Sequence, residues 1–231
     1  EIALINNSIV AAKNGTEHFA TSIVMVGMYI RLFLFPHPLS YDYSYNTIPI
    51  ATPADFRFLA SFAVIVAILV YIGFNWKKKD PAAFGLLFFG LTISIVSNMV
   101  IIIEATLGER FAYMPSLGLS MAAPILLGRV VKLRKTQVAS VRELFTSSKA
   151  FVGIITVTLL LFSVKTISRN PDWKTSATLF KADKDNNPRS ARTQFSYASN
   201  LIHMTIVSMD DADPKKEKLT REAIDYLNRS I

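Results

Sequence analysis

The chain has 231 residues, of which 51% are hydrophobic and 18% are charged, and its formal net charge is +8. Its mean hydropathy of +0.35 is too high for an ordinary soluble domain, and its charge is too high for a bundle that lies wholly in the membrane. We therefore expect a membrane part and a soluble part, and the absence of Cys excludes disulfides and thiolate metal sites from both.

The N-terminal part opens with Glu1–Leu4, which has neither an initiator Met nor a signal-peptide pattern, so we expect the chain to be a fragment of a longer protein. The first apolar stretch is residues 19–35, which Arg31 interrupts. Two placements remain open for this stretch: a helix that spans the membrane, or a helix that lies in the interface between lipid and water.

Residues 35–49 form a polar, aromatic loop with the sequence FPHPLSYDYSYNTIP. One His, one Asp, three Tyr and three Pro within fifteen residues are more specific chemistry than a connector between membrane helices needs. Its candidate site residues are His37, Asp42 and Tyr45, and Arg57 follows at the end of the loop. The alternatives are structural: His37 as a hydrogen-bonding group between two prolines, and the tyrosines as an interfacial aromatic belt.

Four further apolar stretches are candidate membrane spans. Three of them carry no charge and have about the length that crosses a hydrocarbon core as a helix: residues 58–76, 82–103 and 111–128. The fourth, residues 150–165, is short, but Lys149 and Lys165 can extend to the two interfaces. Any one of these stretches could be a buried helix of a soluble core, but four in series argue against that interpretation. They predict an all-α, polytopic membrane bundle.

A second polar segment precedes the span at 111–128. It contains Glu109, Arg110 and Tyr113, which open directly into an apolar helix. Charged groups inside a membrane bundle are costly and usually functional, which makes these three residues candidates for binding substrate. The alternative is that Glu109 and Arg110 form a structural ion pair.

Lysines and arginines set the predicted orientation. The turn Lys77–Lys79 and the loop 129–149 together hold nine of the 25 basic residues, so we expect both on the cytoplasmic side. The loops 36–57 and 103–110 and the tail after Lys165 then face outward, into a periplasm or a lumen. Anionic lipid accounts for the positive charge of the two basic loops, and no nucleic-acid partner is needed.

The tail, residues 169–231, has apolar residues at helical spacing on two segments. The first set is Phe195, Ala198, Leu201 and Ile202, and the second is Ala223, Leu227 and Ile231. A polar connector separates them, which predicts two antiparallel helices similar to a tetratricopeptide repeat. One repeat cannot bury its apolar face alone, so we expect more repeats after it. An unrelated helical hairpin is the alternative.

Three motifs in order carry a resemblance to a known family. They are the loop 35–49, the Glu-Arg-x-x-Tyr-x-Pro-Ser pattern at Glu109–Ser116, and the Arg-Asn-x-x-Trp pattern at Arg169–Trp173. With this spacing of spans, the sequence resembles the transmembrane and tetratricopeptide-repeat O-mannosyltransferases, most closely their bacterial members. The resemblance implies that residues 1–168 are the C-terminal part of a membrane domain of the C-type glycosyltransferase superfamily, and that residues 169–231 begin a repeat domain.

The resemblance also implies an activity. Such enzymes transfer a sugar, here expected to be mannose, from a polyprenyl-phosphate donor to a Ser or Thr hydroxyl of an exported protein, which the repeats recruit. We expect Arg110 to meet the donor phosphate, Glu109 to orient it, and His37, Tyr45 and Tyr113 to line the sugar pocket, with Asp42 and Arg57 also near substrate. The sequence predicts no metal site and no cofactor besides the donor substrate.

The catalytic base is not assigned. In this superfamily it lies in an outward loop upstream of this chain, and Asp42 is the nearest carboxylate candidate here. We therefore expect residues 1–231 to be inactive alone. Two other functions stay open: a membrane-anchored repeat scaffold without catalysis, and a carrier of lipid-linked sugar. The expected location is a bacterial plasma membrane in preference to the endoplasmic reticulum.

Overall fold

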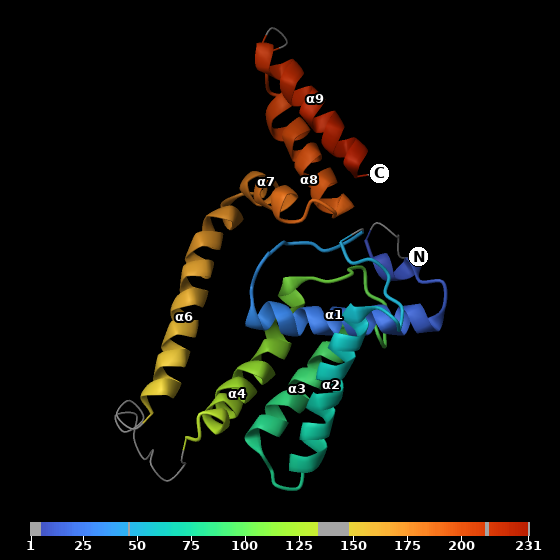
Figure 1. Cartoon of the computed structure of the whole chain (residues 1–231). Helices are drawn as coiled ribbons and strands as arrows, with labels where there is room; N and C mark the ends of the chain where they lie inside the picture. The colour runs from blue at the N-terminus through green and yellow to red at the C-terminus, as the bar shows by residue number, and fades with distance from the viewer. Residues whose placement is uncertain (1–5, 46, 134–147, 211–212, 231) are drawn as a thin grey trace.

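The structure, a computed structural model, describes residues 6–45, 47–133, 148–210 and 213–230. Over these ranges the chain is helical and has no strand, which confirms the all-α prediction. Figure 1 shows a helical bundle with a helical tail at one end. The helices of the bundle are α1 (Gly15–Leu34), α2 (Phe56–Asn75), α3 (Pro81–Val96), α4 (Tyr113–Val130) and α6 (Lys149–Arg169). Those of the tail are α7 (Ser176–Asn186), α8 (Ala191–Leu201) and α9 (Pro214–Arg229).

Three helices follow the predicted spans closely. They are α2, α4 and α6, and each begins or ends within a few residues of the expected limits. The start of α2 is fixed by Asp55, whose carboxylate accepts a hydrogen bond from the backbone N–H of Arg57 at 2.8 Å. By length and composition, each of the three segments that contain these helices can cross a membrane. The chain is therefore a multi-pass membrane protein.

The predicted span at 82–103 is corrected by the structure, because α3 ends at Val96. The next residues turn away from the helix axis, and Asn98 adopts a φ of 58°, which Asn tolerates better than most residues. Its buried side chain then holds the following loop: Oδ1 accepts from the N–H of Ile103 at 2.9 Å, and Nδ2 donates to the carbonyl of Thr106 at 3.1 Å. These polar contacts replace the last two turns of the expected helix.

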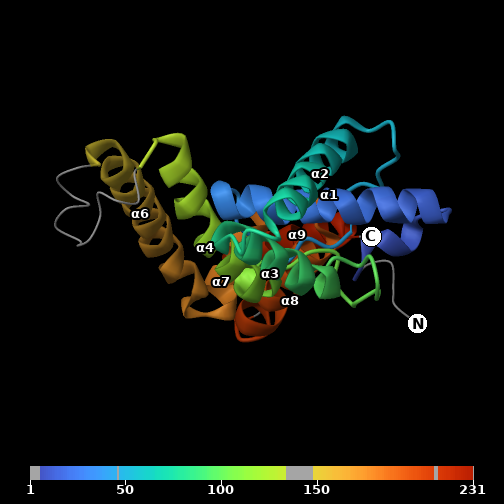
Figure 2. The same ribbon diagram turned by 90° about the horizontal axis from the view of Figure 1, so that it is seen from below.

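The first apolar stretch forms α1, which lies crosswise over the ends of α2, α3 and α4 in Figure 1 and again runs across α2 in Figure 2. It is long and apolar enough to span a membrane, but its middle is covered on all sides, since residues 20–26 are all buried. Thr21 is satisfied inside this cover, because its hydroxyl donates to the carbonyl of Glu17 and accepts from the N–H of Ala51. Both predicted placements of α1, as a span and as an interfacial helix, stay predictions.

Helices α3 and α4 pack through glycine. A Cβ atom on Gly85 would lie 2.6 Å from the carbonyl oxygen of Gly118, and one on Gly118 would clash in the same way with the carbonyl oxygen of Gly85. Small residues at a helix crossing let two backbones approach this closely in a membrane bundle. Helix α6 differs: from residue 150 to residue 168 none of its side chains is buried, and it stands apart from α1 to α3 in both views (Figures 1 and 2).

In the tail, α8 and α9 form an antiparallel hairpin that packs on α7 (Figure 1). Lys184 of α7 fixes this packing, because its ammonium lies 5.0 Å from the ring centre of Tyr197 and 4.9 Å from that of Tyr226. It also donates a hydrogen bond of 2.9 Å to the hydroxyl of Tyr226. The hairpin agrees with two predicted helices, and its identity as a tetratricopeptide repeat stays a prediction.

Candidate functional site

The first polar loop folds over α1 and meets the short 3-10 helix η2 (Glu109–Ala112). The contact is made by Glu109, whose Oε1 accepts hydrogen bonds from the backbone N–H of Ser40 and from the hydroxyl of Tyr43, both at 2.7 Å. Burial, and then the Glu109 carboxylate, raise the pKa of the Tyr43 phenol above its ordinary value, so this hydroxyl stays a donor. The two predicted polar segments thus meet at Glu109.

The same loop contacts the tail through Asp183 of α7. One carboxylate oxygen accepts from the backbone N–H of Tyr41 at 2.6 Å, and the other pairs with the guanidinium of Arg169. Arg169 lies at the end of α6, is 8% exposed, and also pairs with Asp172 at 2.9 Å. Its Nε atom is buried and has no hydrogen-bond partner in the described part of the chain. A buried ion pair therefore links loop, span and tail.

Asp42 makes a second connection to the tail. Its Oδ2 accepts hydrogen bonds from the backbone N–H of Ser44 at 2.9 Å and from the hydroxyl of Ser190 at 3.0 Å, and its carbonyl accepts from the amide of Asn187 at 2.9 Å. The residue is 6% exposed. This arrangement supports an anchor between loop and tail more than it supports the role of a base, which needs access to an acceptor hydroxyl.

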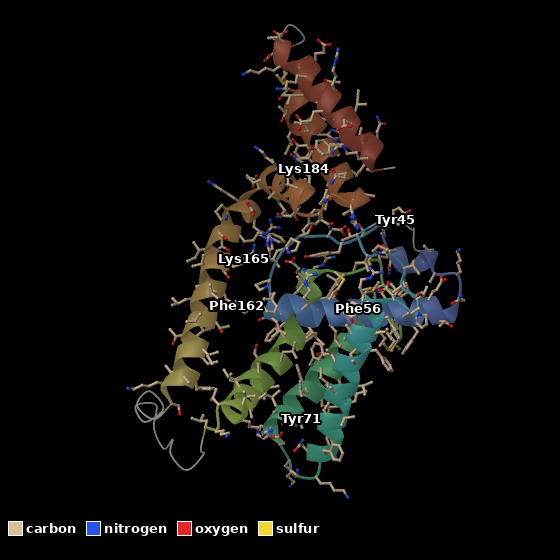
Figure 3. The ribbon with its side chains drawn as sticks, viewed as in Figure 1. Tyr45, Phe56, Tyr71, Phe162, Lys165 and Lys184 are labelled. Atoms are coloured by element: carbon tan, nitrogen blue, oxygen red, sulfur yellow. The ribbon has the colours of Figure 1, made fainter. Side chains whose placement is uncertain are left out.

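Cations lie at the rim of this junction. Arg31 of α1 donates to the carbonyl of His37 at 2.9 Å, and the ammonium of Lys165 lies 3.4 Å from Nδ1 of His37. Lys165 points from α6 toward the loop in Figure 3. Neither Arg31 nor Lys165 forms an ion pair with a carboxylate of the described residues. Two uncompensated positive charges therefore converge on His37, where an anionic group can bind.

Arg110 is exposed and forms no ion pair with Glu109, so the structure does not support the alternative of a structural ion pair between them. The guanidinium of Arg110 lies 4.6 Å from the ring centre of Phe111. Tyr113 is also exposed, at the start of α4. The side chain of Arg57 pairs locally with Asp55 at 2.5 Å. These contacts leave Arg110 and Tyr113 open to a ligand and bind Arg57 to its own helix start.

A cavity of about 190 Å³ adjoins the junction between α1, the first loop and the tail. It is lined by Met28, Arg31, Leu32, Pro38, Tyr43, Thr47, Asn186 and Asn187. Tyr45, the remaining predicted residue, is partly exposed and lies two residues before Thr47 of the lining. Its carbonyl accepts a hydrogen bond from the N–H of Ala191. The cavity combines one cation, amides and hydroxyls, a mixture that can hydrogen-bond a polar molecule.

Sequence reasoning missed Asp183, Ser190 and Asn187 as parts of this junction. Asp183 lies in a helix rich in Lys and Asp, where nothing in the local pattern distinguishes it from its exposed neighbours. Arg169 did have a signal, because it begins the Arg-Asn-x-x-Trp pattern. In the ranges that the structure describes, no group of three His, Asp or Glu side chains could hold a metal ion.

Comparisons with known proteins give a consistent picture. A family model described as "Protein O-mannosyl-transferase TMTC, DUF1736" matches residues 5–69, which include α1 and the first polar loop. The "Protein O-mannosyl-transferase TMTC1" of Mus musculus is 30% identical over 189 residues, and the alignment covers 79% of this chain and 19% of that protein. The protein of the same name from Homo sapiens is 28% identical, with 79% and 20% covered. The chain thus spans about a fifth of these curated relatives. No solved structure matches.

Proposed function

This chain is related to the TMTC protein O-mannosyltransferases, as its sequence motifs predicted, and on this basis we propose its function. The chain binds a polyprenyl-phosphate mannose donor and an acceptor protein for transfer of the sugar to a Ser or Thr hydroxyl. The tail recruits the acceptor on the outer side of the membrane, which we propose to be a bacterial plasma membrane.

The observation that carries the proposal is the polar junction at the end of the bundle. The buried pair of Asp183 and Arg169 and the half-buried Glu109 hold the loop, and the cations Arg31 and Lys165 stand at its rim. A donor of this kind has an apolar chain that stays in the lipid and a phosphate at the lipid–water boundary. The end of an apolar bundle with unpaired cations matches both parts.

The chemistry of the proposed transfer is a displacement at the anomeric carbon. The acceptor hydroxyl oxygen forms a bond to that carbon while the bond from carbon to phosphate oxygen breaks, and a carboxylate takes the hydroxyl proton. Polyprenyl phosphate leaves with one more negative charge. An exposed guanidinium such as that of Arg110 stabilises this charge with two parallel hydrogen bonds. No carboxylate of this chain is assigned as the base, since Asp42 is engaged as an anchor.

The test measures donor binding rather than turnover, because we expect residues 1–231 to be silent in transfer. The chain is placed in lipid nanodiscs and titrated with a photoreactive polyprenyl-phosphate mannose. Arg110→Ala loses a charge-assisted contact of roughly 1.5–3 kcal/mol, so crosslinking affinity falls about tenfold to a hundredfold. Arg110→Lys keeps the charge without the planar fork and falls less.

The matched control is Arg221→Ala, which removes an exposed guanidinium from α9 of the tail. It leaves donor binding unchanged. Melting temperatures of the same preparations separate a lost contact from a damaged fold. Wild-type binding by Arg110→Ala contradicts the assigned role. A chain that binds acceptor peptide but no donor is a scaffold, and one that binds donor but no acceptor peptide is a carrier.

A further inference from the structure

A hollow of about 680 Å³ lies at the turn between α2 and α3. It is at the end of the bundle opposite the tail (Figure 1). Tyr71 of α2 lies near this end in Figure 3. Its lining is Asn75, Trp76, Lys77, Lys79, Asp80, Pro81, Ala83 and Phe84. Neither the polar junction nor the proposed transfer uses this part of the molecule.

The charge of the hollow is positive. Asp80 is the carboxylate of its lining, and it is already neutralised: its Oδ2 lies 2.9 Å from Nη1 of Arg129 and accepts from the hydroxyl of Tyr71 at 2.6 Å. The Arg129 guanidinium holds the pKa of the Asp80 carboxyl well below its usual range, so this pair stays ionised and balanced. Lys77 and Lys79 form no ion pair with the described residues. Two residues of the lining therefore carry unbalanced positive charges.

The walls of the hollow are apolar and exposed. Trp76 is 60% exposed and Phe84 is 58% exposed, and Pro81 and Ala83 also line the hollow. Tryptophan beside lysine at the end of apolar helices is typical of the lipid–water interface. A ligand that satisfies this hollow must combine a negative head with an apolar body, and inorganic phosphate lacks the second.

We propose that this hollow binds one anionic phospholipid, whose headgroup phosphate pairs with Lys77 and Lys79 and whose acyl chains contact Trp76 and Phe84. The charge complementarity and the exposed aromatic wall select this occupant. A zwitterionic phospholipid brings the same chains but adds a cation to its headgroup, which the two lysines repel.

The chain offers an internal probe, because it has two Trp residues, Trp76 and Trp173. Trp173→Phe leaves Trp76 as the single tryptophan, inside the proposed site, and its fluorescence is excited selectively over that of tyrosine. In phosphatidylcholine nanodiscs, a minor fraction of brominated phosphatidylglycerol quenches this fluorescence more strongly than the same fraction of brominated phosphatidylcholine. Lys77→Gln and Lys79→Gln each lower the preference for the anionic lipid about fivefold, since a lysine at an anionic surface contributes about that factor.

The matched control is Lys132→Gln. Lys132 is exposed, follows α4 at the same end of the bundle, and has a φ of 56° against 49° for Lys79. The preference survives in this variant if the hollow is a site. An equal loss in Lys132→Gln, or equal quenching by the two brominated lipids, overturns the proposal in favour of diffuse attraction. Relief of the quenching by inorganic phosphate also overturns it, because the site then selects any anion.

Discussion

At the scale of single residues, the local pattern of the first polar loop predicted a special role but not the partners that define it. Glu109 and Asp42 were expected near substrate, which stays a prediction, and the structure shows that both also hold the loop in place. The decisive partner, Asp183, is 142 residues from Tyr41 in the sequence. Spacing along a chain reports only neighbours on one element, so a contact across this separation leaves no local signal.

The buried ion pair gives a prediction at this scale. Asp183 is fully buried, and Asp183→Asn leaves the guanidinium of Arg169 buried beside a neutral amide. Breaking one partner of such a pair costs about 3–5 kcal/mol. We expect a markedly lower melting temperature and faster proteolysis between α6 and α7.

The neighbouring carboxylate supplies the control for this experiment. Asp185 lies two residues away on the same helix and pairs with Lys184, but its side chain is 72% exposed. Asp185→Asn costs roughly 1 kcal/mol or less. Equal melting temperatures for the two variants show that Arg169 and Asp183 contribute little to the joint between bundle and tail.

At the scale of elements, uncharged apolar runs predicted α2, α4 and α6 well, because such a run has no alternative to a helix in lipid. The end of α3 was missed because the run continues to residue 103 without a charge. What ends the helix is a buried network in which the amide of Asn7 donates to Oδ1 of Asn98 at 2.8 Å. Asn7 is remote from Asn98 in the sequence. A single polar residue such as Asn98 within an apolar run does not indicate where its partner lies.

Glycine packing gives the prediction for elements. Gly85→Ala places a Cβ atom 2.6 Å from the backbone of α4, so α3 and α4 must separate. Such overpacking costs about 1–3 kcal/mol. The melting temperature of the bundle in detergent falls accordingly.

The same helix provides the control. A Cβ atom added to Gly90 would meet no atom within 4 Å beyond the backbone of its own helix, so Gly90→Ala is neutral or stabilising by up to about 1 kcal/mol through helix propensity. If both variants melt alike, the close approach of α3 and α4 is not what holds this crossing together.

At the scale of the whole molecule, composition predicted the division into an apolar bundle and a charged tail. The alternation of basic and less basic loops predicted which loops lie on the same side of the membrane. The structure places the Lys77–Lys79 turn at one end of the bundle and the tail at the other (Figure 1). The crosswise position of α1 was left open, since its length and hydropathy equal those of a span. The cover of α1 comes from loops distant in sequence, as in the hydrogen bond from the N–H of Ala51 to the hydroxyl of Thr21.

The orientation in the membrane can be tested directly, because the chain has no Cys of its own. Single Cys residues are introduced as Lys78→Cys in the α2–α3 turn and Lys218→Cys on α9, both at exposed positions. In intact cells an impermeant thiol reagent labels position 218, and position 78 reacts only after permeabilisation. Labelling at 78 but not at 218 reverses the proposed topology and moves the tail to the cytoplasm.

The position of α1 in the sequence has a consequence for synthesis and folding. The ribosome delivers α1 before the segments that enclose it, which are the loop 36–55 and the loop 97–108. At that point α1 is long and apolar enough to enter the bilayer as a helix. We therefore expect α1 to reach its final packing only after residues 97–108 have been made, because the loops that cover it follow it in the chain.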